Sequence, residues 1–197
     1  EIISILEKEI SKHDVVVIMD PQHGMLTPNL ISNVVKLCKN YKKPLHVDVQ
    51  VFHRPSNHHL YKRVDSIILN QKETVSVSPN FNFKNPEISL KEIQKKLEVK
   101  NVIVKLGEHG SVALMGERFI KTTPHRVTAV DVCGAGDAFL AAYSLSDKSE
   151  PEISLHLANI WGGLSTEIHG TIPPKKESLL NVINMNNKDT ERIQIKL

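Results

Sequence analysis

Residues 14–49 read DVVVIMDPQHGMLTPNLISNVVKLCKNYKKPLHVDV and hold two apolar runs with one helical pattern between them. The runs at 14–20 and 45–49 are short and rich in β-branched residues, which is typical of buried parallel strands. Between them Pro28 begins an amphipathic segment that Pro44 ends. The stretch therefore predicts a strand, a helix and a second strand in succession.

The same alternation continues on both sides of this stretch. A helical pattern precedes it, and further segments predict a strand at 66–70, a helix at 89–97 and a strand at 101–106. This order predicts an α/β fold with a mostly parallel, doubly wound sheet and helices on both faces. Ligands of such sheets gather at the carboxyl ends of the strands. From Gly107 onward, the short pieces GSVALMG and ERFIKTTPHRV indicate antiparallel strands at the edge.

The last third of the chain is predicted to be mainly helical. VTAVD at 127–131 is expected to form a strand that turns into the apolar helix AFLAAYSL. A second helix is expected to bury a stripe at steps of three or four, namely Ile153, Leu157, Ile160, Leu164 and Ile168. We expect residues 1–197 to form a single domain, with 185–197 as a loosely held tail.

Composition excludes several classes of protein. The chain has 197 residues, 40% of them hydrophobic and 24% charged, which is typical of a globular domain with a real core. Aromatic residues make up 5% and are not interleaved with basic runs, so nucleic acid is an unexpected partner and an anionic small molecule is favoured. No apolar run reaches the ~18 residues of a membrane span. Two isolated cysteines, Cys38 and Cys133, give neither a zinc spacing nor a disulfide framework, so we expect a reducing, cytoplasmic setting.

The segment DVCGAGDAF at 131–139 carries the strongest chemical signal. Its glycines, Gly134 and Gly136, let the backbone approach a ligand closely where a helix begins. The amides from Gly134 to Asp137 would then face an anion with the positive end of the helix dipole behind them. A carboxylate at Asp137 can orient a hydroxyl and accept its proton. The alternative is a plain helix N-terminus preceded by a glycine turn.

DVCGAGDAF resembles the second signature of the ribokinase/PfkB family of carbohydrate kinases, which normally reads DTTGAGDAF. The resemblance implies a ribokinase-like fold that binds ATP, with a sugar or phosphosugar as the acceptor. It implies that Asp137 is the catalytic base and that Gly134, Ala135 and Gly136 form the anion hole. It also implies that Asp131 helps to shape a potassium site near the nucleotide.

The segment LNQKE at 69–73 places Asn70 and Glu73 three residues apart after a predicted strand. By itself this spacing is a capping box at a helix start. LNQKE also resembles a segment of the ribokinase/PfkB family. In that family the matching pair lies beside the triphosphate and organises magnesium and its waters. A magnesium ion held mainly by phosphates and water agrees with so few carboxylates.

Two more segments resemble the walls of the family's nucleotide site. VKLGEHGS at 104–111 resembles the TLGxxG segment, with Lys105 in place of the usual Thr or Ser. A lysine there could contact a phosphate or point outward, and the two glycines could simply make a hairpin turn. LANIWGGLSTEIHGT at 157–171 resembles the helix and loop around adenine. The nucleotide-binding positions implied by these two segments are Lys105, Gly107, Glu108, Gly110, Asn159, Gly163 and Gly170.

The histidines of FHRPSNHH at 52–59 are a weaker signal. His53, His58 and His59 lie close together, but no HExxH or paired cysteine spacing accompanies them. We therefore expect a polar loop with exposed imidazoles in preference to a metal site.

Residues 14–73 run in the order and spacing of the heptose-phosphate kinase branch of the family. That branch phosphorylates the anomeric hydroxyl of heptose 7-phosphate, a step towards ADP-heptose and lipopolysaccharide. Where it has DYGKG and VDPKG, this chain has DPQHG at 20–24 and VDVQV at 47–51. Asp20 and Asp48, at strand ends, are candidates for contacts with the acceptor or for turn caps.

The resemblance begins inside the family pattern, so we expect an excised or processed piece that lacks the N-terminal sugar-binding signature and the small β lid. The leading hypothesis is the ATP-binding and catalytic part of a sugar kinase. One alternative is a nucleotide-binding fragment or subunit without independent kinase activity, whose partner would be a second copy, in a homodimer, or another chain that supplies the lid. Another is a dinucleotide-binding oxidoreductase, although DPQHGM replaces the expected GxGxxG after the first strand.

Overall fold

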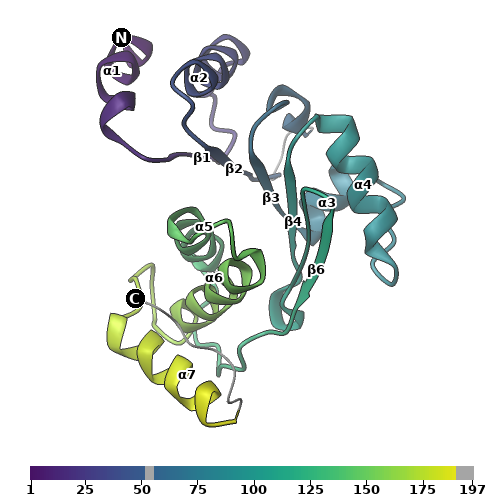
Figure 1. Cartoon of the computed structure of the whole chain (residues 1–197), viewed down its shortest axis with the longest axis vertical. Coiled ribbons are helices and arrows are strands. Elements are labelled where there is room, and N and C mark those ends of the chain that lie inside the picture. The colour runs from purple at the N-terminus through teal and green to yellow at the C-terminus, as the bar shows by residue number, and fades with distance from the viewer. Residues whose placement is uncertain (52–55, 190–197) are drawn as a thin grey trace. The chain divides into compact units, whose positions relative to one another are not determined.

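The computed structural model describes residues 1–51 and 56–189, with side chains described as far as residue 185 in the last helix. The chain divides into two compact units, Glu1–Thr123 and Pro124–Leu197. The first contains the whole sheet, and the second is helical over the residues described (Figure 1).

The sheet of the first unit has six strands in the order β1 to β6. Neighbouring strands from β1 to β4 are parallel, and β5 and β6 are antiparallel. The strands are β1 (Val16–Asp20), β2 (Leu45–Val49), β3 (Ser66–Asn70), β4 (Asn101–Lys105), β5 (Ser111–Met115) and β6 (Arg118–Thr122). The α/β prediction of a mostly parallel sheet with an antiparallel edge is confirmed, and β2 and β3 have the predicted bounds.

Helices connect the parallel strands. The first unit contains α1 (Ile2–Glu9), α2 (Pro28–Asn40), α3 (Gln71–Val77) and α4 (Pro86–Leu97), with 3-10 turns at Ile10–Lys12, His58–Leu60 and Gly107–His109. Helix α2 begins where Thr27 Oγ1 accepts the Leu30 amide at 3.3 Å and Pro28 takes the first helical position. Helix α4 ends at Glu98, which adopts a left-handed conformation with φ of 55°.

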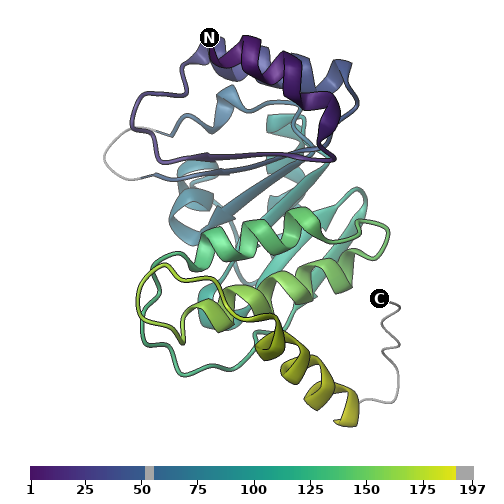
Figure 2. The same ribbon diagram turned by 90° about the vertical axis from the view of Figure 1, so that its left-hand side faces the viewer.

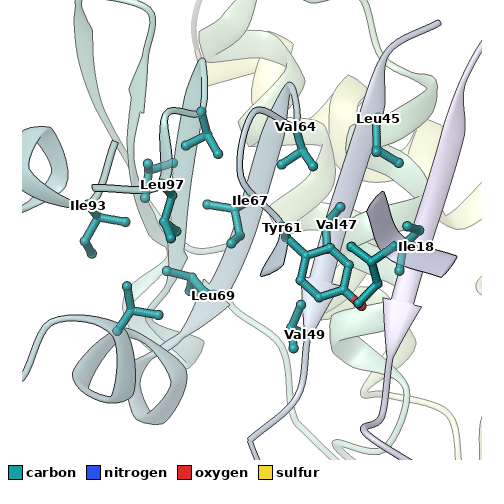
Figure 3. Close-up of a cluster of buried hydrophobic side chains, with 14 of the residues drawn as sticks. Ile18, Leu45, Val47, Val49, Tyr61, Val64, Ile67, Leu69, Ile93 and Leu97 are labelled. Atoms are coloured by element: carbon teal, nitrogen blue, oxygen red, sulfur yellow. The ribbon is translucent and has the colours of Figure 1, made fainter. Parts of the chain in front are cut away.

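The core lies on one face of this sheet. Alternate residues of β1 to β3 point to it, and side chains of α2 and α4 complete it. Tyr61, which is 0% exposed, places its ring beside Ile18, Val47 and Val49 (Figure 3). Burial of such a side chain contributes roughly 1.5–3 kcal/mol. Because a buried phenol needs a partner, the Tyr61 hydroxyl donates to Asp20 Oδ2 at 2.7 Å.

The second unit contains α5 (Ala135–Leu145), α6 (Pro151–Ser165) and α7 (Lys176–Asp189), and α5 and α6 pack side by side (Figure 2). Gly162 permits this packing, because a Cβ there would lie 3.2 Å from the Ala135 carbonyl oxygen. The fully buried face of α6 includes Leu155 and Ala158. The predicted stripe is correct at Ile160 and Leu164, but Ile153 and Leu157 are half-buried and Ile168 lies beyond the helix end.

One expectation for this part of the chain is corrected. VTAVD at 127–131 is not a strand, since none of the described residues of the second unit forms one. Its amides find another acceptor, because Val130 and Asp131 both donate to the Thr166 carbonyl, at 2.7 and 3.0 Å. The tail expected from 185 is helical as far as Asp189, and residues 190–197 lie outside the described residues. Within the described ranges, no helix is both long enough and apolar enough to cross a membrane.

Candidate active site

The start of α5 has the geometry of an anion site. Gly134 is the N-cap residue and adopts a left-handed conformation with φ of 82°, which glycine reaches without strain. Gly136 and Asp137 are the second and third residues of the helix, where backbone amides have no acceptor inside the helix. The Ala135 amide was expected to face an anion, but it donates to the Val132 carbonyl at 3.3 Å. Asp137 lies in the first turn with its side chain exposed.

Asp131 ties the turn before α5 to the loop after α6. Its Oδ1 accepts the Cys133 amide at 2.9 Å, and its Oδ2 accepts the Gly170 amide at 3.0 Å. These backbone hydrogen bonds hold the pKa of Asp131 below its usual range. The two segments also touch at Gly134, where a Cβ would lie 3.3 Å from Thr171 Cγ2. Asp131 therefore shapes the loop around the start of α5.

In the first unit, polar side chains gather at the carboxyl ends of the parallel strands. The register pairs Asp48 with Ile68 and Asn70 with Lys105, so these side chains share one face of the sheet. The Lys105 ammonium forms an ion pair with Asp48 Oδ2, and the two side chains are only 16% and 6% exposed. Neither sequence alternative for Lys105 included this partner, although both residues stood at predicted strand ends.

Asn70 and Glu73 form the predicted capping box of α3. The Asn70 amide and side-chain Nδ2 each donate to one Glu73 oxygen at 2.6 Å, and the Glu73 amide donates to Asn70 Oδ1 at 2.9 Å. Glu73 is 2% exposed. Burial and the nearby Asp48 carboxylate raise the pKa of Glu73 to about 7, against the opposing effects of the Asn70 amide and Lys105.

This donor set suits magnesium held through water. Each Glu73 oxygen accepts one hydrogen bond from Asn70 and retains a second lone pair for a water. Over the described residues, no three His, Cys, Asp or Glu side chains converge into a metal cage. Magnesium commonly keeps several waters and takes phosphate oxygens as ligands, so the Asn70 and Glu73 pair fits such an ion.

The remaining predicted nucleotide residues lie in turns and on α6. Gly107 and Gly110 have positive φ values of 59° and 81° and join β4 to β5, and the Leu106 amide closes the turn on the Gly110 carbonyl at 2.8 Å. The hairpin alternative is therefore correct as local structure. Glu108 is exposed on the turn. Asn159 donates to the Leu155 carbonyl at 2.8 Å, and Gly163 lies against Val127.

Asp20 acts as a loop anchor. Its carboxylate is buried and accepts the Gln22 amide at 2.8 Å, Asn57 Nδ2 at 2.9 Å and the Tyr61 hydroxyl at 2.7 Å. These donors come from the loop after β1 and from residues 57–61, so Asp20 ties the two segments together. Of the two roles left open by the sequence, the structure shows the turn cap, which sequence alone could not assign because Asn57 and Tyr61 are distant along the chain.

The expectation of exposed imidazoles is wrong for His58. This side chain is 1% exposed, its Nδ1 lies 2.6 Å from Ser56 Oγ, and burial lowers its pKa to about 4. His59 is exposed as expected, and His53 lies outside the described residues.

The sequence model of the pfkB family of carbohydrate kinases matches residues 6–178. The chain belongs to this family. Membership decides against a dinucleotide-binding oxidoreductase. The match runs through both compact units, from α1 into α7.

Curated proteins that match the chain are much longer than it is. It is 26% identical to the bifunctional protein HldE of Koribacter versatilis, over 88% of this chain and 36% of the relative. It is 29% identical to the protein of the same name from Campylobacter jejuni strain RM1221, over 81% and 34% respectively. The chain thus spans little more than a third of the length of these relatives.

Solved structures of the same fold confirm the ribokinase-like prediction. Ribokinase from Arabidopsis thaliana, complexed with ribose and ATP, has a TM-score of 0.75 and 23% identity over 90% of this chain and 58% of its own. Phosphofructokinase-2 from Escherichia coli, in complex with potassium, has a TM-score of 0.72 and 17% identity over 93% and 61%. At these identities the likeness establishes the fold.

Proposed function

We propose that the chain is the ATP-binding and catalytic part of a kinase that phosphorylates a sugar or phosphosugar hydroxyl. The observation that carries this proposal is the start of α5, where Gly134 adopts a left-handed conformation and Asp137 lies exposed in the first turn. Family membership supports it, since the match includes this helix. The same match covers residues 6–178 and supports the proposal that the two units belong to one ribokinase-like domain.

Asp137 acts as the general base. The acceptor oxygen attacks the γ-phosphorus of ATP, and the acceptor proton passes to Asp137. The bond between the γ-phosphorus and the bridging β,γ-oxygen breaks, and ADP leaves. The amides of Gly136 and Asp137 and the positive end of α5 stabilise the charge on the transferring group. Asp131 holds the turn that leads into these amides, so a potassium effect would act through that turn.

Asn70 and Glu73 would hold the waters of a magnesium ion, which would neutralise phosphate charge when bound. The glycine turn at Gly107 and Gly110 borders the nucleotide together with Glu108, and Asn159 and Gly163 lie at the adenine. The buried polar set around Asp48 and Lys105 supports this assignment, because it lies at the carboxyl ends of parallel strands, where ligands of such sheets bind.

For the acceptor we propose heptose 7-phosphate, phosphorylated at its anomeric hydroxyl. The order and spacing of the segments at 14–73 support this choice, as does the name HldE of the curated relatives. The full-length protein is tested with heptose 7-phosphate, ribose and fructose 6-phosphate in a coupled assay of ADP release. A larger kcat/KM for ribose or fructose 6-phosphate would contradict the heptose assignment and leave the kinase assignment intact.

Asp137→Asn tests the role of the base. We expect turnover of the full-length protein to fall by about 10²–10⁴-fold, since this is what a positioned base contributes, while calorimetry finds ATP binding within about twofold of wild type. Glu152→Gln is the matched control, because Glu152 is an exposed acidic residue in the first turn of α6. Full activity of Asp137→Asn would refute the assignment.

A nucleotide-binding module without independent kinase activity is the second candidate. The observation in its favour is coverage, because the chain spans 36% of one curated relative and 58% of a structural neighbour. It predicts that the 197-residue chain binds ATP in calorimetry but transfers no phosphate until a partner chain or a second copy supplies the lid. Phosphate transfer by the chain alone, at low concentration, would exclude this candidate.

A further inference from the structure

An ion pair and a nearby buried glutamate lie at the carboxyl ends of the parallel strands of the first unit. Asp48 comes from β2, Lys105 from β4, and Glu73 from α3, directly after β3. The Asp48 and Lys105 side chains are 6% and 16% exposed, and Glu73 is also buried. The three groups are close enough that Asp48 and Lys105 both act electrostatically on Glu73.

The Lys105 ammonium is fixed in place by Asp48. If Lys105 moved away to follow a ligand, the buried Asp48 carboxylate would lose its ion-pair partner, which is strongly unfavourable. A hydrogen bond to a partly hydrated phosphate would return less than this cost. Lys105 therefore stays with Asp48 and acts on its surroundings through its charge.

This fixed charge changes the electrostatics of the cluster. With both carboxylates ionised, Asp48, Glu73 and Lys105 sum to one negative charge, whereas an uncharged residue at position 105 would leave two. A less negative site attracts a divalent cation less and repels nucleotide phosphates less.

We propose that Lys105 is a built-in counter-ion of the nucleotide-phosphate site, held by Asp48, which lowers the dependence of ATP binding on magnesium. The inference rests on the proposed function, because it takes the cluster as the place where the phosphates bind. Lys105 is thus a positioning residue that acts through charge and does not touch the reacting atoms.

Lys105→Thr is the direct test. Calorimetry on the 197-residue chain gives the Kd for ATP with magnesium and the Kd with EDTA. We expect the ratio of the second to the first to rise about tenfold in Lys105→Thr, because one unit of nearby positive charge is lost. Lys121→Thr removes the same charge from an exposed position on β6 and should leave the ratio unchanged.

Metal binding without nucleotide supplies a second readout that does not depend on ATP. Electron paramagnetic resonance measures free Mn²⁺ in the presence of the chain. Lys105→Thr should bind Mn²⁺ several-fold more tightly than wild type, and Asp48→Asn, which removes a negative charge and keeps the lysine, more weakly. The opposite signs separate a counter-ion from a general loss of structure, and Asp48→Asn keeps the test open if Lys105→Thr fails to fold.

The outcomes distinguish this inference from the function on which it rests. ATP binding with an unchanged ratio in Lys105→Thr would overturn the counter-ion alone. Equal weakening with and without magnesium would make Lys105 a direct phosphate ligand and would also overturn it. If the wild-type chain bound ATP under neither condition, the proposed function and the counter-ion would both fall.

Discussion

His58 is a titratable side chain with almost no access to water. Its pKa of about 4 in the folded chain lies below the ordinary value of 6.5, because burial disfavours the charged imidazolium. Between these two values the unfolded chain binds a proton that the folded chain does not. Stability should therefore fall as pH drops from 6.5 towards 4.

His58→Gln tests this dependence. We expect the wild-type chain to lose about 2 kcal/mol more of its free energy of unfolding than His58→Gln does, on going from pH 7 to pH 5. Urea denaturation at the two pH values measures the difference. Equal losses in the two proteins would show that His58 does not titrate as its burial implies.

The effect of His58 has to be read from the difference between wild type and His58→Gln, because Glu73 also makes stability depend on pH. Its pKa of about 7 is raised from 4.5, so the unfolded chain releases its proton first and stability falls as pH rises between these values. This effect opposes that of His58 over much of the same window. The wild-type profile alone would show only their sum.

Individual residues also show what sequence could and could not predict. Asp137 follows from a local pattern, and the structure places it in the first turn of α5 as that pattern requires. The pairing of Lys105 with Asp48 depends on strand order and register, which connect residues far apart in the chain. The burial of His58 likewise arises from packing, whereas its neighbours in sequence are polar.

Helix α6 carries two adjacent glycines with different surroundings. A Cβ at Gly162 would meet the Ala135 carbonyl oxygen at 3.2 Å, and one at Gly163 would first meet Val127 Cγ1 at 3.5 Å. The first contact is tight and involves backbone of α5, while the second is ordinary van der Waals contact. The two glycines therefore differ in whether they are needed for packing.

Substitution by alanine separates the two cases. Gly163→Ala should raise the free energy of unfolding by about 0.5–1 kcal/mol through helix propensity. Gly162→Ala gains the same propensity but must push α5 away, so we expect it to be at least about 1 kcal/mol less stable than Gly163→Ala. Urea denaturation of the pair decides, and equal stabilities would contradict the close approach of α5 and α6 at Gly162.

At the level of elements, prolines in the sequence predicted where β2 and α2 begin. Strand β2 begins directly after Pro44, and α2 begins at Pro28 with the Thr27 cap, because proline cannot donate an amide hydrogen bond. The strand predicted at 127–131 was wrong because β-branched composition cannot reveal whether a neighbouring strand exists. Its amides at Val130 and Asp131 instead donate to Thr166.

For the whole molecule, the segment that joins the two compact units contains an exposed arginine. Residues 123–129 have no regular secondary structure, and Arg126 within them is exposed. Exposed, irregular segments are preferred sites of proteolysis. Limited trypsin digestion should therefore release a fragment that ends at Arg126.

Mass spectrometry of the digest checks this expectation. The fragment of residues 1–126 should appear in wild type and disappear in Arg126→Gln, while other fragments persist. Digestion that proceeds at other sites without this product would show that the segment is protected. The sequence did not indicate the division between the two units. No Gly-rich or charged linker stands at the division, and the family match continues through it.

The strand order also bears on how the chain folds. Every strand from β1 to β6 pairs with its immediate neighbour in sequence, so each ladder closes the shortest loop available to it. Loop-closure entropy grows with loop length, and low contact order favours rapid folding. A chain emerging from the ribosome could add each strand to a completed edge without waiting for later sequence. This vectorial assembly would limit the time for which apolar strand edges remain open to aggregation.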